Sequence, residues 1–576
     1  MNSPIPSSAA RAKRLPEGWL VWLIGTVTAY IALLILTRPL DYVDSLHYAK
    51  HVADQYNLQL AANTNPFYDF GHVLWRPLVY LLWSPIRGPL QAMFNGDDIL
   101  AVAAVEIAIN IAGGLLAAIF LFFTVARTTR NAKVACITTI GYLSTNALLT
   151  YSQNGVAYGL GIAFQVVAIC VLQYALSEGK FTFFWGVLSG SMLGLSIVTW
   201  FPYILGAGGI GCYALLTRDT SDAPKLRERM AGLAGLIAGT AAMTVLIYGI
   251  VMAIMHLTTV DSFMEWMARS RYGKEPDRGV LRMLGGIPRS FLALGDLNVT
   301  LKRMLFEDRT FSLTALVETG IWKVALVYSV LSTAVVALWR SSWGRIHLVC
   351  LSALAIPLGI FAAFLFEGAP AERYLAAFPL LFLAFGHILA DQRRRFARGW
   401  IGLFFVCMLA TNVVALSRFG NETEFAAASA RLRAINEKLL PQDQIVLMSY
   451  RDAAFVLVNA QPFSPLSKNR YLFSIGLPWG ITHKERWRMN FANSTRKTWG
   501  EGGRVWLSTR FVSPTPDPAW GWVEGDLVGI GWQDLTSFFR QLTLVDSFGG
   551  TDGFAEVART AENERLFREV IGSQAP

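Results

Sequence analysis

Charged residues and cysteines are scarce in this sequence. Only 16% of its 576 residues are charged, against about a quarter in an average soluble domain. Hydrophobic residues make up 53% of the chain. This balance excludes a soluble protein of ordinary composition, so we expect an integral membrane protein.

The five cysteines all fall inside apolar runs, and no Cys-x-x-Cys pair occurs. This placement argues against a disulfide framework and against a zinc site made of cysteines. The sequence also has no P-loop, no dinucleotide-binding glycine pattern and no His-Glu-x-x-His motif. We therefore assign no cofactor.

Apolar stretches close to the ~20 residues that cross a bilayer recur along the chain. They lie at about 19–37, 98–124, 134–150, 154–177, 181–199, 201–217, 231–256, 316–339, 346–366, 373–390 and 400–416. The first is too long for a secretion signal, so we interpret it as an uncleaved span. The sequence predicts about eleven transmembrane helices.

The positive residues are distributed unequally between alternate loops. With the N-terminus in the cytoplasm, the short cytoplasmic segments hold Arg11, Lys13, Arg14, Arg127, Arg130, Lys133, Lys180, Arg218, Lys225, Arg227, Arg229, Arg340, Arg345, Arg393, Arg394, Arg395 and Arg398. The short outer turns hold only Arg373. This is the positive-inside pattern, and it explains most of the net charge of +10 without a nucleic-acid partner. We expect a bacterial inner membrane protein.

The fifth and sixth stretches are joined only by the residues from Trp200 to Pro202. They could form a tight hairpin, a broken helix or one long tilted helix. Counting them as one span would invert the charge pattern of every later loop, so we predict two spans.

Three longer segments then lie outside the cytoplasm: residues 38–97, 257–313 and the chain after 417. The last has a helical pattern at 424–439, apolar runs at 444–448 and 504–507, and a helix followed by a strand at 534–545. We predict a membrane domain over residues 1–416 and an extracytoplasmic α/β domain over residues 417–576.

The first outer loop opens with two carboxylates, Asp41 and Asp44. If Asp44 begins a helix, then His47, Tyr48 and His51 share one face with it. The cluster is open to three interpretations: a catalytic carboxylate beside a membrane-borne substrate, a solvated helix that the aspartate only caps, or a divalent metal site of the two histidines and Asp44. We assign no metal here.

A second part of this loop, residues 71–83, is apolar but too short to span the membrane. We expect a helix that lies in the interface. His72 and Arg76 near its start could face Asp44 or contact lipid headgroups.

With these motifs the chain resembles the GT-C membrane glycosyltransferases, such as protein O-mannosyltransferases and the lipid A aminoarabinose transferase. The likeness lies in the acidic motif Asp41-Tyr-Val-Asp44 with Tyr48 beyond it, in Trp75-Arg76-Pro77, and in Glu372-Arg373-Tyr374 at the start of a late span. Members often have Asp-Glu where this chain has Asp44-Ser45. The departure leaves the choice of base between Asp44 and Asp41 open.

The resemblance implies transfer of a sugar, with inversion, from a polyprenyl-phosphate donor to a hydroxyl of a lipid, glycan or protein acceptor. Asp44 would be the base, with Asp41 as second choice. Substrate contacts would come from Tyr48, His47, His72, Arg76, Arg269, Arg271, Lys274, Glu372, Arg373 and Tyr374. Membrane lipids would be the other partners.

Two other functions fit parts of the sequence. An O-antigen-type polymerase or ligase would place its functional residues in a large late loop, whereas here the acidic motif follows the first span. A transporter or flippase would place ionisable residues at mid-membrane depth, where Glu106 and Gln165 are candidates.

Overall fold

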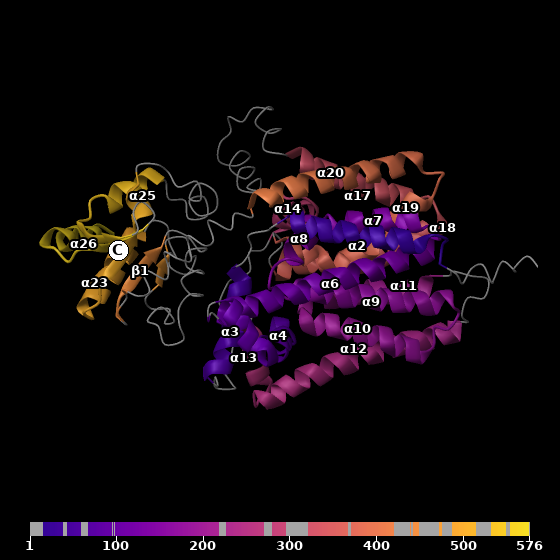
Figure 1. Cartoon of the computed structure of the whole chain (residues 1–576), viewed down its shortest axis with the longest axis horizontal. Coiled ribbons are helices and arrows are strands. Elements are labelled where there is room, and N and C mark those ends of the chain that lie inside the picture. The colour runs from indigo at the N-terminus through magenta and orange to yellow at the C-terminus, as the bar shows by residue number, and fades with distance from the viewer. Residues whose placement is uncertain are drawn as a thin grey trace, which may run out of the picture. The chain divides into compact units, whose positions relative to one another are not determined.

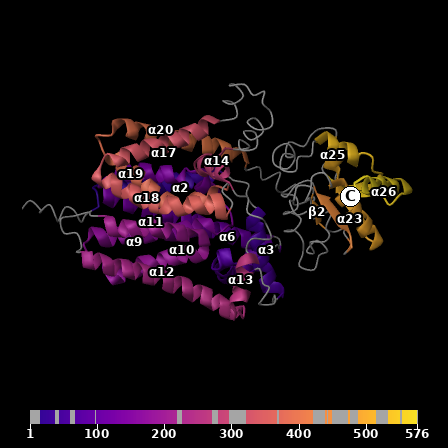
Figure 2. The ribbon, with the colours of Figure 1, turned by 180° about the vertical axis from the view of Figure 1, so that it is seen from behind.

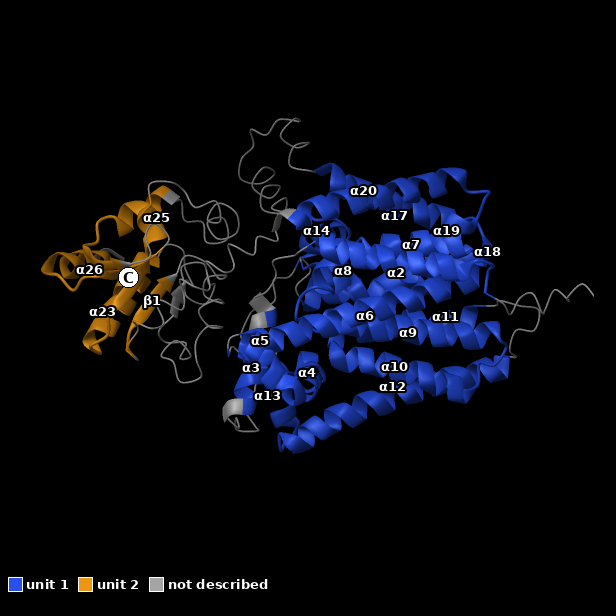
Figure 3. Ribbon diagram, viewed as in Figure 1, with its two compact units in different colours: residues 1–295, 313–420 blue, residues 296–312, 421–576 orange. Residues whose placement is uncertain are grey.

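The computed structural model describes residues 15–37, 43–58, 67–94, 96, 98–217, 226–269, 279–294, 321–366, 370–419, 438, 440, 442–447, 472–474, 487–513, 532–548 and 553–574. The chain divides into two compact units, residues 1–295 with 313–420 and residues 296–312 with 421–576 (Figure 3).

The first unit is a bundle of apolar helices, which run side by side in both views (Figures 1 and 2). Within the described residues, eight segments are long and apolar enough to cross a membrane: α2 (Trp19–Leu36), α6 (Asp98–Thr129), α9 (Tyr158–Ser177), α12 (Leu226–Ile254), α17 (Ile321–Trp339), α18 (Ser342–Ile360) continued by η6 (Phe361–Leu365), η7 (Ala371–Ala377) continued by α19 (Phe378–Ala390), and α20 (Arg395–Phe419). Shorter apolar helices are α7 (Ala132–Leu143), α10 (Phe183–Thr199) and η4 (Phe201–Leu205) with α11 (Gly206–Leu216). The predicted polytopic helical membrane protein is confirmed, while the number of eleven crossings stays a prediction.

The predicted helix at 134–150 is two helices in the structure. After α7 the chain turns at Ser144 and Thr145, and α8 spans Asn146–Tyr151. Thr145 has extended backbone angles, and its hydroxyl accepts a hydrogen bond from the Leu148 N–H at 3.4 Å. A threonine that caps a helix in this way begins a new one.

The fifth and sixth predicted spans form a hairpin. The backbone of Trp200 is extended, with φ −150° and ψ 110°, and this ends α10 before η4 begins. The two ends of the hairpin that lie away from its turn both contact the start of α12. Arg229 donates to the Leu215 carbonyl at 2.8 Å, and a Cβ added at Gly235 would lie 2.1 Å from the Phe183 carbonyl oxygen. Glycine thus lets α10 and α12 pack backbone to backbone.

The segments predicted to lie outside the cytoplasm contribute short helices at one end of the bundle, where Figure 1 shows α3, α4 and α13 and Figure 2 again shows α3 and α13. The first segment forms α3 (Val43–Leu58), η2 (Phe70–His72), α4 (Trp75–Trp83), η3 (Ser84–Ile86) and α5 (Arg87–Met93), and the second forms α13 (Val260–Arg269) and α14 (Val280–Phe291). The helix expected at 71–83 is therefore present. Trp75 and Trp83 are fully buried, which anchors α4 to the bundle.

The second unit is built on a five-stranded sheet of order β2-β1-β3-β5-β4. Its strands are β1 (Gln444–Leu447), β2 (Leu472–Ser474), β3 (Val505–Ser508), β4 (Leu544–Phe548) and β5 (Phe554–Val557), and its helices are α23 (Trp487–Gly500), η11 (Thr509–Val512), α25 (Trp532–Phe539) and α26 (Ala561–Gln574). β1 pairs in parallel with β2 and β3, whereas β5 is antiparallel to β3 and β4. The predicted α/β fold is confirmed; the helix expected at 424–439 lies almost wholly outside the described residues.

Candidate functional site

The first outer loop places a buried arginine over a tyrosine ring. Arg76 of α4 is fully buried, and its guanidinium carbon lies 4.4 Å from the centre of the Tyr48 ring on α3. Its Nη1 is 3.5 Å from the carboxylate of Asp69. An aromatic face and an acid together offset the cost of burying the charge. The guanidinium group of Arg76 thus forms the contact between α3 and α4.

Asp69 is positioned by its own turn. Its Oδ1 accepts a hydrogen bond from the Gly71 N–H at 3.0 Å and caps η2, while its Oδ2 faces Arg76. The His72 N–H donates to the Asp69 carbonyl at 3.1 Å. One aspartate therefore holds both the turn and the guanidinium.

His72 is held in one tautomer beside this pair. Its Nδ1 lies 3.3 Å from the Thr199 carbonyl oxygen, and its ring centre is 5.5 Å from that of Tyr48. Because a carbonyl can only accept, Nδ1 carries the proton. Burial lowers the pKa of His72 to about 4, against the attraction of Asp69. His72 is thus neutral at pH 7, with the lone pair on Nε2.

This burial predicts a pH dependence of stability. Between its usual pKa of 6.5 and the folded value of about 4, His72 binds a proton only in the unfolded chain. The free energy of unfolding should therefore fall as the pH drops from 6.5 towards 4. Thermal unfolding in detergent across this range should have a shallower slope in His72→Gln, and an unchanged slope would contradict the assignment.

A second, largely buried arginine reaches the same region from a distant part of the chain. Arg373 of η7 has its guanidinium carbon 4.4 Å from the ring centre of Phe366 and 5.6 Å from that of Trp200. Tyr158 packs 4.6 Å from Trp200 and 5.8 Å from His72, ring centre to ring centre. Aromatic rings thus connect Arg373 with His72, and the charge of Arg373 contributes to the low pKa of His72.

Glu372 accompanies Arg373 and is fixed by another span. Its Oε1 is 3.7 Å from the Arg373 Nη2, and its Oε2 accepts a short hydrogen bond from the Tyr151 hydroxyl. This ion pair would suffice to explain Arg373 as a purely structural residue. Its place against the aromatic rings is compatible with a binding role as well.

The turn between α8 and α9 contacts α4, which carries Arg76, and α3. Tyr151, the last residue of α8, contacts Glu372 beside Arg373. Trp75 donates from Nε1 to the Gly155 carbonyl at 3.0 Å, and the Gly155 N–H donates to the Ser45 hydroxyl at 2.6 Å. Asn110 of α6 donates to the carbonyls of Asn154 and Val156. In each of these bonds the turn contributes a backbone N–H or carbonyl group, which fixes the turn against α3, α4 and α6.

Glu106 lies beneath this turn and is completely buried in α6. Neither of its carboxylate oxygens has a hydrogen-bond partner among the described residues. Arg76 is the cation that acts on it electrostatically. A buried acid without a partner is costly in a membrane helix, so its position between α3 and Arg76 marks it as part of the site.

Gly155 is the tightest point of this arrangement. A Cβ added there would lie 2.3 Å from Oε2 of Glu106 and 2.9 Å from Cβ of Ser45. Gly155→Ala should destabilise the membrane domain by about 2 kcal/mol through overpacking and lower its thermal unfolding temperature in detergent. Gly249→Ala, where a Cβ meets nothing within 4 Å, should cause no loss; equal losses in both variants would show that the contact is unimportant.

The predicted site residues fall into four groups. Tyr48, His72, Arg76, Glu372 and Arg373 are brought into one continuous set of contacts. Tyr374 instead donates from its hydroxyl to the Met283 carbonyl on α14, at 3.0 Å. For Asp44, His47 and Arg269 only the backbone is described, whereas Asp41, Arg271 and Lys274 lie outside the described residues.

Asp44 lies in the first turn of α3, as predicted. It precedes Tyr48 by one helical turn, so the two positions share a face. Arg269 ends α13, in which Trp266 donates to the Tyr68 carbonyl at 2.7 Å. Among the described side chains no cluster of three metal-ligating groups occurs. The possible metal site of Asp44, His47 and His51 includes side chains outside that description and stays an open alternative.

Sequence reasoning overlooked Asp69, Tyr151, Tyr158 and Trp200. Asp69 carried one usable signal, since an acid seven residues before a buried arginine can reach it across a turn. The three aromatic residues lie in apolar surroundings, where composition does not distinguish a binding wall from a helix contact.

No family model and no curated protein matches the sequence. Among solved structures, the oligosaccharyltransferase of Archaeoglobus fulgidus in its apo form aligns with a TM-score of 0.50 and 13% identity over 94% of this chain and 75% of that chain. ArnT from Cupriavidus metallidurans, bound to undecaprenyl phosphate, aligns with a TM-score of 0.49 and 12% identity over 95% of this chain and 99% of that one. The likeness to the archaeal protein confirms the resemblance to GT-C enzymes at the level of the fold.

Proposed function

We propose that this chain is a membrane glycosyltransferase that moves one sugar from a polyprenyl-phosphate donor to an acceptor hydroxyl. The observation that carries the proposal is a pair of guanidinium groups joined by aromatic rings: the fully buried Arg76 and the largely buried Arg373. Arg76 lies over Tyr48, which follows Asp44 by one helical turn. A base and a phosphate clamp are the two requirements of this reaction.

In the proposed reaction the acceptor oxygen attacks the anomeric carbon while the bond from that carbon to the phosphate oxygen breaks. The acceptor proton passes to the carboxylate of Asp44, or of Asp41 if that residue is the base. The phosphate leaves with the bonding electrons, and Arg76 and Arg373 stabilise its growing charge. Attack on the face opposite the phosphate inverts the anomeric configuration.

The neutral state of His72 suits this role. Its Nε2 lone pair can accept a hydrogen bond from a sugar hydroxyl, and a neutral ring adds no charge that would compete with the arginines. Stacking of sugar faces on Tyr158 or Trp200 would orient the donor. The reaction needs no cofactor, because the guanidinium groups supply positive charge at the leaving group.

The positive-inside pattern supports an inner membrane protein with a cytoplasmic N-terminus. In that orientation the site and the C-terminal domain would face the extracytoplasmic side. A donor held in the outer leaflet could then reach the site along the interfacial helices. The acceptor would be a lipid, glycan or protein hydroxyl.

The test is transfer of radiolabelled sugar from a panel of polyprenyl-phosphate donors into membranes that contain the protein. Parallel reactions with EDTA, and with added Mg²⁺ or Mn²⁺, examine the metal alternative. We expect transfer from at least one donor, inverted at the anomeric carbon and insensitive to EDTA. Uptake of a labelled compound into vesicles without any transfer would instead identify a transporter.

A further inference from the structure

A cavity of about 410 Å³ lies at the end of the bundle opposite the candidate site. It is bounded by the last residues of α6 and α19 and the first residues of α18. Each of these segments reaches the candidate site with its other end: Glu106 lies near the start of α6, Phe366 follows η6, and Glu372 and Arg373 precede α19. The cavity is therefore separate from the proposed catalytic region.

Two imidazole rings face each other in this cavity. His347 and His387 have ring centres 4.5 Å apart, and the ring of Trp343 stacks on His387 at 5.5 Å. The Nε2 atoms of both histidines are buried and have no hydrogen-bond partner among the residues that the structure describes. A buried polar nitrogen without a partner is costly, so a ligand that bonds to both would stabilise the protein.

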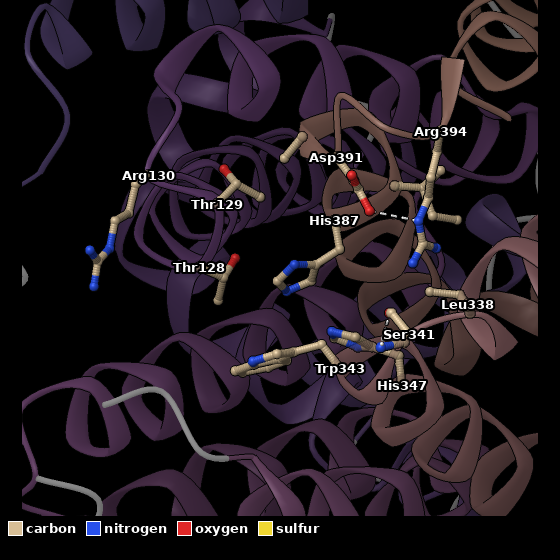
Figure 4. Close-up of a pocket in the computed structure, with 13 residues that line it drawn as sticks. Thr128, Thr129, Arg130, Leu338, Ser341, Trp343, His347, His387, Asp391 and Arg394 are labelled. Carbon is tan, nitrogen blue, oxygen red and sulfur yellow. Dashed lines mark hydrogen bonds and ion pairs between the residues drawn. The ribbon is translucent and has the colours of Figure 1, made fainter. Parts of the chain in front are cut away.

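The charges around the cavity favour an anion. Asp391 is neutralised within the protein, because its Oδ2 accepts from Nε of Arg394 at 2.7 Å and its Oδ1 accepts from the Arg393 N–H at 3.0 Å. Arg130, by contrast, makes no hydrogen bond or ion pair with any described residue. Figure 4 shows Arg130 on one side of the cavity, Arg394 on the other and the ring of His387 between them.

Arg130 also has an unfavourable backbone. It follows the end of α6 with φ +54°, in the left-handed region. Glycine is the residue usually found at this position after a helix, because any Cβ adds strain there. An arginine at a position suited to glycine points to a use for its side chain.

The chain next to the residues that line the cavity is rich in the positive residues of the positive-inside pattern. Exposed cations around the cavity are Lys133, Arg340, Arg345, Arg393 and Arg395. Such a surface attracts anionic lipid headgroups. The cavity volume falls in the range of small-molecule sites, about 300–1,000 Å³, and Leu338 and Ile388 add apolar walls for the organic part of a headgroup.

We propose that this cavity binds a phosphate group, with Arg130 and the two histidines as its ligands. The phosphate could belong to an anionic lipid headgroup or be free in solution. Described metal-ligating side chains form no cluster of three, and the cavity's one acid is already paired, so a cation is the less suitable occupant.

The test is native mass spectrometry of the purified full-length protein in detergent, titrated with phosphatidylglycerol. We expect one tightly bound lipid in the wild type and about tenfold weaker binding in Arg130→Gln, as for loss of one charge-assisted hydrogen bond. Arg345→Gln removes a nearby exposed arginine that does not line the cavity and should stay within about twofold of the wild type. Equal losses in the two variants would overturn the proposal.

A second variant, Arg130→Gly, tests whether weaker lipid binding results from misfolding. It relieves the left-handed strain, so its unliganded form should unfold at a higher temperature than the wild type while binding remains weak. Wild-type binding in this variant would overturn the proposal. Displacement of the lipid by millimolar inorganic phosphate would identify free phosphate as a ligand, whereas resistance to it would identify the headgroup; absence of binding by either probe would refute the site.

Discussion

Asp44→Asn should reduce sugar transfer on the order of 10³-fold while the protein still folds and inserts. General-base catalysis contributes roughly 10²–10⁴ to a rate, and an amide of the same size cannot take the acceptor proton. Asp44 is the second residue of α3, where exchanging a carboxylate for an amide costs about 0.3–1 kcal/mol of interaction with the helix dipole. The substitution therefore removes the proton acceptor at a small cost to the helix.

The same helix offers a matched control. Asp54 lies further along α3 and forms an ion pair with Lys50 at 2.8 Å. Asp54→Asn should leave transfer within about twofold, since such i, i+4 pairs contribute only a few tenths of a kcal/mol. Transfer rates of Asp44→Asn, Asp41→Asn and Asp54→Asn decide the base: full activity in Asp44→Asn with loss in Asp41→Asn would assign the role to Asp41.

Hydropathy predicted the apolar helices well, because the bilayer imposes a nearly fixed length on each span. It predicted less well where the chain bends within an apolar stretch. The helix cap at Thr145, inside the stretch predicted as one helix at 134–150, depends on one residue's local geometry. A sliding average over about twenty residues does not register such a residue.

The candidate site was predicted in part. Its acidic motif, Arg76 and the Glu372-Arg373 pair came from short sequence motifs and a family resemblance. The contacts that join them depend on tertiary packing, as with Tyr158 between His72 and Trp200. Nothing in the sequence gives the distance between residues more than a hundred positions apart.

From the sequence, Glu106 enters only as a residue that the alternative transporter function could use. In the sequence it is one acid in a long apolar run. The structure places it beside Ser45 and Gly155, against the turn that holds α3. Its depth in the span is therefore explained by the site at the end of the bundle.

Arg76→Gln should lower transfer about 100-fold, the cost of removing one donor that stabilises charge in a transition state. It should also reduce the free energy of unfolding by about 3 kcal/mol, because Asp69 would stay buried without its partner. Transfer assays and thermal unfolding in detergent measure the two effects. Since both are expected, a loss of transfer alone would not separate binding from folding.

The double variant Asp69→Asn/Arg76→Gln separates them. It removes both charges of the buried pair, which are 3.5 Å apart, so much of the lost stability should return while transfer stays low. Recovery of transfer together with stability would mean that Arg76 serves the fold alone.

Arg87 in the same loop provides the matched control. Its guanidinium carbon lies 4.3 Å from the ring centre of Tyr56, and its Nη2 is 2.6 Å from Asp98, so it repeats the arrangement of Arg76 at a quarter-exposed position. Arg87→Gln should cost at most about 1 kcal/mol and leave transfer within about twofold. Arg76 is fully buried and lies over Tyr48, whereas Arg87 is a quarter exposed and lies over Tyr56. The proposed function therefore requires that Arg76→Gln lowers transfer and that Arg87→Gln does not.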